Sequence, residues 1–260
     1  MLHFVDSNSG TDWAAVCNLV NSDRKTEMMF LMDNLNVASE SVLEIGCNVG
    51  ELTALLADNG ARVCAVDPSS VMVSEARKKI KNPETYDRAT FRETSFMEIE
   101  QLLGQQYGLI VVPSNGFMSI IDPEDQQEFL LTITRLLLPN GKLILVSCTP
   151  QMRWLMADPA VIYHYKDVFK HDGGRLILSA QSDYDDYSQV GVFRVYAEFL
   201  DDDGVVTKKI SHNFDYRFTY VWEMHNLLKL CGFHNVKLYG DFDQRPHNQN
   251  CESMIWVAAT

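Results

Sequence analysis

The chain has 260 residues, of which 46% are hydrophobic, and its formal net charge is −13. That length and apolar content suffice for one sizeable core and favour one or two domains. So acidic a surface would be repelled by phosphate backbones, which disfavours nucleic-acid partners, although the same charge also serves ordinary solubility.

The cysteines, the apolar runs and the first residues together predict a cytoplasmic protein. No two cysteines form a CxxC pair, so we expect reduced thiols and no metal site. No apolar run approaches the roughly 18 residues of a membrane span, so no membrane association is expected. The first ten residues also lack the basic and apolar regions of a signal peptide.

Up to residue 148 the chain alternates strand-like and helix-like segments. Apolar residues at helical spacing predict a first helix over 11–35. Strands are then predicted at 41–46, 61–66, 89–93, 107–113 and 142–148, and helices at 51–59, 70–80 and 123–138, with a turn at 139–141. This order predicts a mainly parallel sheet with helices on both faces.

After residue 148 the periodicity of the sequence changes from helical to alternating. Three runs with period two, 175–184, 189–200 and 205–218, are separated by polar turns and predict antiparallel strands. A helix over 219–231 and a strand pair at 233–240 and 252–259 are expected to follow.

The segment from Val42 to Asp67 reads strand, glycine-bearing turn, helix, strand, and it ends on an acid. This order builds half of a nucleotide-binding site, because ligands of an open α/β sheet lie outside the carboxyl ends of its strands. Asp67 is thereby placed to accept hydrogen bonds from a ribose diol. The alternative is that Asp67 only caps the next helix.

The spacing of the turn residues decides which nucleotide fits. A dinucleotide fingerprint would need glycine where Asn48 and Glu51 stand, and no Gly-Lys-Ser/Thr sequence follows as in a P-loop. What remains is Glu44, Gly46 and Gly50 in the pattern acid-x-Gly-x-x-x-Gly. This pattern resembles motif I of the class I S-adenosylmethionine-dependent methyltransferases, with Asn48 at the family's middle glycine. Asn tolerates left-handed backbone better than other non-glycine residues.

The resemblance covers most of the chain and implies a Rossmann-like, mainly parallel seven-stranded sheet with helices on both faces. It also implies a small antiparallel β insertion after strand five, over the cofactor mouth. The domains expected on this basis are a helical cover at 1–38, a cofactor-binding core at 39–150, the insertion as a substrate lid at 151–218, and a closing helix and strand pair at 219–260.

The resemblance also implies that S-adenosylmethionine is the cofactor. The residues expected to bind it are Glu44, Gly46, Cys47, Asn48, Gly50, Asp67, Pro68, Met72, Ser95, Phe96, Val112, Pro113 and Ser114. Ser95 stands where relatives often have an acid for the adenine amino group, and a hydroxyl can accept the same hydrogen bond. For Met72, a purely structural place in the core is an equal alternative.

The sequence indicates the catalytic residues less clearly than it indicates the cofactor site. Candidates for proton transfer are His164 and Tyr163, in the linker after strand five, and candidates for substrate contact are Asn115, Tyr216, Arg217 and Tyr220. A structural role is the alternative for each of them. Pro113-Ser114-Asn115 does not match the Asn/Asp-Pro-Pro-aromatic motif of enzymes that methylate exocyclic amines of bases.

The sequence therefore predicts an enzyme that moves a methyl group from S-adenosylmethionine to N, O or C of a small-molecule acceptor. Two alternatives stay open: a non-catalytic methyltransferase-like binding protein, and an RNA or protein methyltransferase. A homodimer also stays open.

Overall fold

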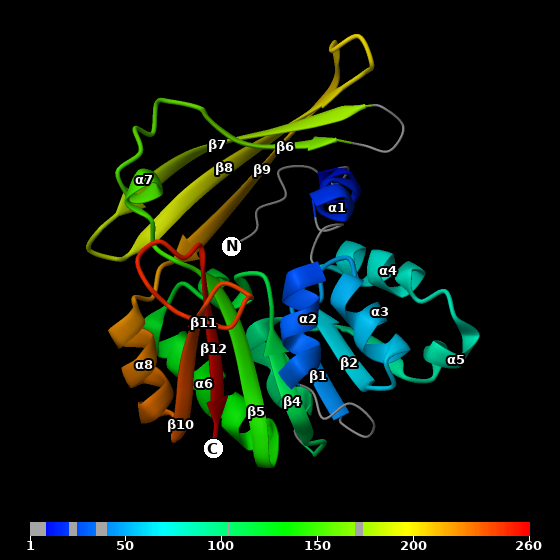
Figure 1. Ribbon diagram of the computed structural model, residues 1–260, viewed down its shortest axis with the longest axis vertical. Helices are drawn as coiled ribbons and strands as arrows, with labels where there is room; N and C mark the ends of the chain where they lie inside the picture. The colour runs from blue at the N-terminus through cyan, green and yellow to red at the C-terminus, as the bar shows by residue number, and fades with distance from the viewer. Residues whose placement is uncertain (1–8, 21–24, 35–40, 103, 170–173) are drawn as a thin grey trace. The chain divides into compact units, whose positions relative to one another are not determined.

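The computed structural model describes residues 9–20, 25–34, 41–102, 104–169 and 174–260. Its contacts divide the chain into two compact units. The larger unit contains the described residues of 24–149 and 219–260, and the smaller unit contains helix α1 (Ser9–Val20) and the described residues of 150–218. Figure 1 shows the elements of each unit.

The larger unit is built on one sheet in the order β11-β10-β12-β5-β4-β1-β2-β3. Its strands are β1 (Ser41–Ile45), β2 (Arg62–Asp67), β3 (Ala89–Glu93), β4 (Tyr107–Val112), β5 (Leu137–Cys148), β10 (Asn235–Gly240), β11 (Arg245–Pro246) and β12 (Ser253–Ala259). The first five run parallel, and β12 is antiparallel to both β5 and β10. The predicted fold class is confirmed, and the two-residue β11 extends the sheet beyond the seven predicted strands.

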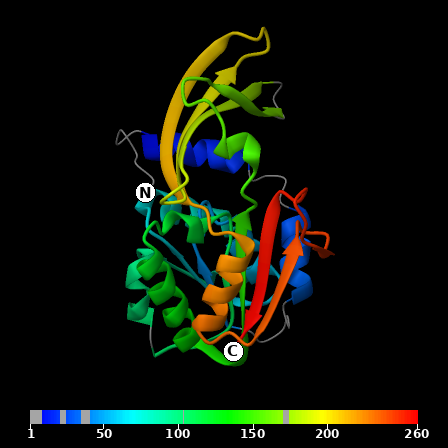
Figure 2. The same ribbon diagram turned by 90° about the vertical axis from the view of Figure 1, so that its left-hand side faces the viewer.

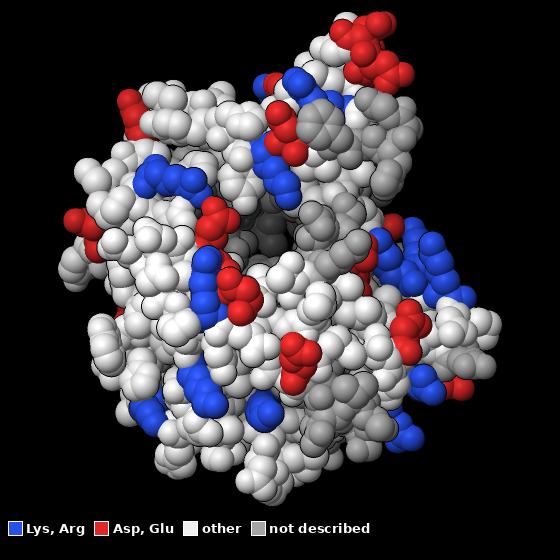
Figure 3. Space-filling model, in the orientation of Figure 1, with Lys and Arg blue, Asp and Glu red and all other residues white. Residues whose placement is uncertain are grey.

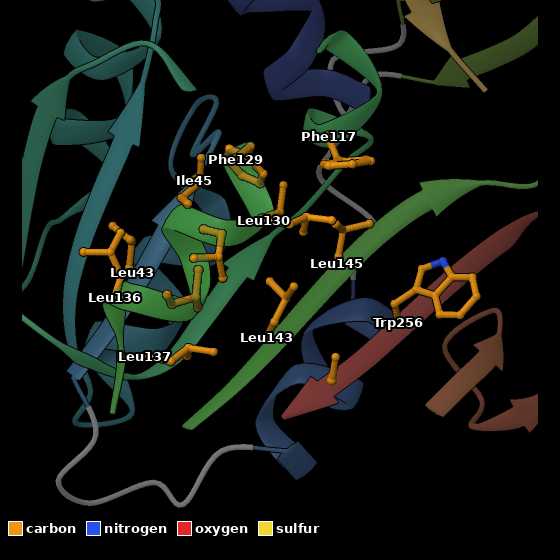
Figure 4. Packing of buried hydrophobic residues seen from close by; sticks show 14 of the residues in the cluster. Leu43, Ile45, Phe117, Phe129, Leu130, Leu136, Leu137, Leu143, Leu145 and Trp256 are labelled. Atoms are coloured by element: carbon orange, nitrogen blue, oxygen red, sulfur yellow. The ribbon is translucent and has the colours of Figure 1, made fainter. Parts of the chain in front are cut away.

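Helices cover both faces of this sheet (Figure 2). Successive side chains of each strand point to opposite faces, so both faces are apolar and need covering. Val42 packs in the apolar cluster of α2 (Lys25–Asn34), α3 (Glu51–Asp58) and α4 (Ser70–Lys79). Its neighbour Leu43 packs in the opposite cluster, under α6 (Pro123–Leu136) and α8 (Val221–Leu230), shown in Figure 4. A short helix α5 (Pro83–Tyr86) lies between α4 and β3. Among the described residues, no helix is both long and apolar enough to cross a bilayer.

Local capping explains where α6 begins. The Asp122 carboxylate accepts a hydrogen bond from the Glu124 N–H at 2.8 Å at the start of α6, and Pro123 takes the first helical position. The C-terminal end of α6 differs from the prediction: the helix stops at Leu136, and β5 begins at once at Leu137. The predicted turn at 139–141 lies inside the span of β5, where the pairing with β4 shifts register.

The smaller unit is a four-stranded antiparallel sheet in the order β6-β7-β8-β9. Its strands are β6 (Tyr163–Phe169), β7 (Arg175–Asp185), β8 (Val190–Leu200) and β9 (Val206–Arg217), and a short helix α7 (Met152–Leu155) precedes them. The three predicted runs form β7, β8 and β9. Strand β6 lies in the segment predicted as a linker, so that prediction is wrong.

Helix α1 packs on this smaller sheet, where Val16 joins Leu176 and Ile210 in one buried cluster. The Trp13 ring stacks on His212 with centroids 4.4 Å apart. The prediction of one helix over 11–35 is therefore wrong: α1 and α2 are separate helices that belong to different units. Residues 1–8, 21–24 and 35–38 of the expected helical cover lie outside the described residues.

Candidate cofactor-binding site

The turn after β1 is hydrogen-bonded to the end of β2. The backbone N–H groups of Gly46 and Cys47 both donate to the Val66 carbonyl, at 2.8 and 3.0 Å. Gly46 and Gly50 have φ of +88° and +81°, and Asn48 between them has φ of +51°. The Asn48 side-chain oxygen also accepts the Val49 N–H at 2.8 Å. The turn thus forms in a left-handed conformation with asparagine at its middle position.

Asp67 stands at the carboxyl end of β2 with only 7% of its surface exposed. Its Oδ2 accepts the Asn48 N–H at 2.8 Å, and its Oδ1 accepts the Ser69 N–H at 2.9 Å. Burial raises the pKa of Asp67 to about 6, although these two hydrogen bonds favour the ionised form. Each carboxylate oxygen can accept a second hydrogen bond, so Asp67 keeps acceptor capacity for a ligand.

Three loops of the larger unit meet at the Phe96 ring. Phe96 begins the 3₁₀ helix η2 (Phe96–Leu102) after β3, and Gly116 begins the 3₁₀ helix η3 (Gly116–Ser119) after β4. A Cβ atom added to either Gly46 or Gly116 would lie 3.6 Å from the tip of this ring. The loops after β1, β3 and β4 are therefore in contact, and Asp67 lies beside them through its bond to Asn48.

Two residues of the predicted motif have structural roles inside the unit. Glu44 is 1% exposed, and its carboxylate accepts the Thr53 hydroxyl of α3 at 2.5 Å. Gly50 lies so close to α4 that an added Cβ would be 2.7 Å from the Cα of Ala76. Thr53 was missed from the sequence, although it is the single hydroxyl among the four buried residues of α3.

The other residues expected to bind the cofactor differ in their exposure to solvent. Cys47, Met72, Val112 and Pro113 are buried, whereas Pro68 is exposed and Ser114 is half-buried. The Ser95 hydroxyl donates to the Glu98 carboxylate at 2.8 Å and so keeps its own oxygen as an acceptor. The contacts of all these residues with a cofactor stay predictions.

The candidate catalytic and substrate residues lie on different units. Tyr163 and His164 lie on β6 of the smaller unit and not in a linker, and the exposed His164 has its Nε2 atom 3.2 Å from Asp167. Tyr216 and Arg217 lie on β9, where the Arg217 guanidinium donates to the Gln189 side chain at 2.6 Å. The remaining two belong to the larger unit: Asn115 precedes η3, and Tyr220 precedes α8. Their roles stay predictions.

The geometry of the larger unit fits an adenosine-containing cofactor. The Gly46 backbone is free of a side chain where the loops meet, and a buried acid with spare acceptor capacity ends the neighbouring strand. Asp67 suits a ribose diol, and the turn after β1 suits a group that must approach the backbone closely. Together with the strand order, these features define the Rossmann-like methyltransferases of class I.

Comparison with known proteins agrees with this class. Residues 42–141 match the family described as methyltransferase domain. A 23S rRNA (uracil-C5)-methyltransferase of Nitrosospira multiformis is 23% identical over 159 residues, which is 59% of this chain and 33% of that protein. The chain thus spans only a third of the length of this relative.

Solved structures resemble the chain over nearly its whole length. The CcbJ methyltransferase from Streptomyces caelestis is 19% identical with a TM-score of 0.72, covering 92% of this chain and 95% of its own. CalS10, an amino pentose methyltransferase from Micromonospora echinaspora, is 14% identical with a TM-score of 0.71, covering 95% of each chain. At these identities the likeness concerns the fold.

Residues 42–141 form a methyltransferase domain of this class, and the solved structures share the fold of nearly the whole chain. The predicted family, fold class, enzyme class and cofactor are thereby confirmed.

Proposed function

We propose that the protein transfers a methyl group from S-adenosylmethionine to an amine, hydroxyl or carbon of a small-molecule acceptor in the cytoplasm. The observation that carries the cofactor half of this proposal is the buried Asp67 carboxylate, hydrogen-bonded to the turn after β1 at the carboxyl end of β2. The six free cysteines support a reducing compartment.

The chemistry divides between the cofactor and the protein. The sulfonium of S-adenosylmethionine supplies an electrophilic methyl group, so the cofactor brings the difficult part of the reaction. The protein has to bind the cofactor through Asp67 and the glycine turn, hold the acceptor in line, and exclude water. Orientation of this kind supplies at best about 7–11 kcal/mol of the reduction in barrier.

Charge and structural likeness support a small acceptor over RNA. The formal charge of −13 opposes binding of a polyanion. Figure 3 shows acidic and basic side chains interspersed on one face, with acidic groups gathered at the β8–β9 turn and basic groups over α4. The CalS10 likeness makes an amino sugar the first acceptor to try. The N. multiformis relative acts on rRNA, so RNA belongs in the test as a second substrate class.

The cofactor half is tested by calorimetry with S-adenosylmethionine and S-adenosylhomocysteine. We expect micromolar binding by the native protein and an affinity at least about tenfold lower in Asp67→Asn. A tenfold change corresponds to about 1.4 kcal/mol, the loss expected for one hydrogen bond to the ligand. Asp87→Asn, the same change at an exposed position, is the control and should bind as the native protein does. No binding of either ligand at millimolar concentration would overturn the proposal.

The acceptor half is tested by methyl transfer from labelled S-adenosylmethionine. The panel contains an amino pentose, a catechol and a 1,3-dicarbonyl compound, for transfer to N, O and C, together with bulk ribosomal RNA. Label in one of the small molecules supports the proposal, whereas label in RNA alone refutes it. Cofactor binding with no transfer to any of the four favours the non-catalytic alternative.

A further inference from the structure

The segment between β10 and β12, residues 241–252, lies at the same sheet edge as the cofactor turn. Ser253 pairs with Cys148, the last residue of β5, and the Thr149 N–H donates to the Glu252 carbonyl at 2.8 Å. Because β1, β2, β4 and β5 are parallel, their carboxyl ends share one edge. Figure 1 shows this segment above that edge, in orange to red.

Several contacts determine the conformation of segment 241–252. The Asp241 Oδ1 atom accepts the N–H groups of Glu252 and Ser253, both at 2.9 Å, and Arg245 forms an ion pair with the same carboxylate. At the end of β10, an added Cβ on Gly240 would lie 2.8 Å from the Cα of His247. The backbone that carries His247 is therefore packed directly against β10.

The His247 imidazole faces the end of β5. Its Nε2 atom lies 3.2 Å from the Thr149 hydroxyl oxygen, across 98 residues of sequence. Partial burial lowers the pKa of His247 below its usual value, and the Asp241 charge offsets part of this effect. The imidazole is thus neutral near pH 7. The other ionisable groups of the segment are Arg245 and Asp243 on the β10 side and Cys251 and Glu252 on the β12 side, whereas Thr149 is uncharged.

The edge between the cofactor turn and His247 is continuous. Strand β4 separates β1 from β5, so the ends of β1 and β5 are about 10 Å apart at the usual strand spacing. The Asn115 N–H donates to the Val146 carbonyl at 3.2 Å, and the Met118 and Cys148 sulfur atoms are 3.6 Å apart. A small acceptor held over the end of β4 would therefore lie between Gly46 and His247.

We propose that His247 is the general base of the methyl transfer, with Thr149 as the residue that positions its ring. This proposal rests on the proposed function above and assigns an N–H or O–H acceptor. The acceptor lone pair forms the bond to the methyl carbon, and the carbon–sulfur bond breaks with its electron pair remaining on sulfur. The acceptor proton moves to the imidazole, and the imidazolium then returns it to water.

The test compares His247→Gln with His234→Gln, a histidine variant at the exposed start of β10 on the opposite sheet edge. With the panel compound that the native protein methylates, we expect kcat to fall about 10²–10⁴-fold in His247→Gln, the usual contribution of a general base. The native rate should rise as the pH rises through the His247 pKa. This rising limb of the pH–rate profile should be absent in His247→Gln. S-adenosylhomocysteine should bind both variants as it binds the native protein.

A second pair of variants tests the role of Thr149. Thr149→Val should shift the pH limb and lower kcat with little change in KM, while Thr149→Ser, which keeps the hydroxyl, should restore the native profile. A His247→Gln variant with native kcat and an intact pH limb overturns the proposal for His247 alone. A native protein without methyl transfer to any panel compound overturns the proposed function and this inference together.

Discussion

Gly46 and Gly50 have nearly the same left-handed backbone but different surroundings, so one substitution at each separates two physical effects. Their φ angles are +88° and +81°. A Cβ on Gly46 meets only the Phe96 ring, at 3.6 Å, an ordinary van der Waals contact. A Cβ on Gly50 lies 2.7 Å from both the Cα and the Cβ of Ala76. The clash at Gly50 is with a helix backbone, which cannot rotate out of the way.

The expected losses follow from these contacts. A left-handed conformation costs a non-glycine residue about 1–2 kcal/mol, which is the whole expected loss for Gly46→Ala. Overpacking against Ala76 adds about 1–3 kcal/mol in Gly50→Ala, for a total loss of about 2–5 kcal/mol in the free energy of unfolding.

Urea unfolding of both variants, followed by circular dichroism, measures the difference directly. Gly50→Ala should unfold at the lower urea concentration, with an unchanged slope of free energy against urea. Equal stability of the two variants, or a smaller loss in Gly50→Ala, would refute the argument that α3 and α4 need glycine where they meet.

Three further predictions concern the same region. Asn48→Gly should change stability by less than about 1 kcal/mol, whereas Asn48→Ala should lose about 1–2 kcal/mol from left-handed strain; equal unfolding midpoints would contradict this. Thr53→Val should lose about 1.5–3 kcal/mol, because the buried Glu44 carboxylate loses a hydrogen bond, and a native midpoint in urea would show that this bond contributes nothing. The raised pKa of Asp67, about 6 against 3.8, should contribute about 3 kcal/mol of stability that is full below pH 3.8 and lost as the pH rises through 6. Unfolding of the native protein and of Asp67→Asn across that window measures this, and parallel stability curves would contradict it.

The elements of the larger sheet could be predicted because their signals are local. Short apolar runs and the spacing from Gly46 to Asp67 act over a few residues, and the structure has strands, helix and turn where they indicate. Strand β6 was missed because its sequence, YHYKDVF, mixes aromatic and charged residues on an edge strand whose side chains are mostly exposed.

What the sequence could not indicate depends on contacts between distant residues. The periodicity over 11–35 is helical throughout, yet it cannot reveal that α1 packs on β9 while α2 packs on α3. The ends of β5 and of segment 241–252 are brought together only by the antiparallel return of β12. For that reason the Thr149–His247 contact had no local signal.

The discontinuous smaller unit has a consequence for synthesis of the protein on the ribosome. Helix α1 is made before the strands that cover Val16, which carry Leu176 and Ile210. Its apolar side therefore stays uncovered while about 160 further residues are translated. Pairing of such distant segments slows folding. A protein shortened by its first 20 residues would expose the apolar face of β7–β9, and aggregation during expression is the expected result.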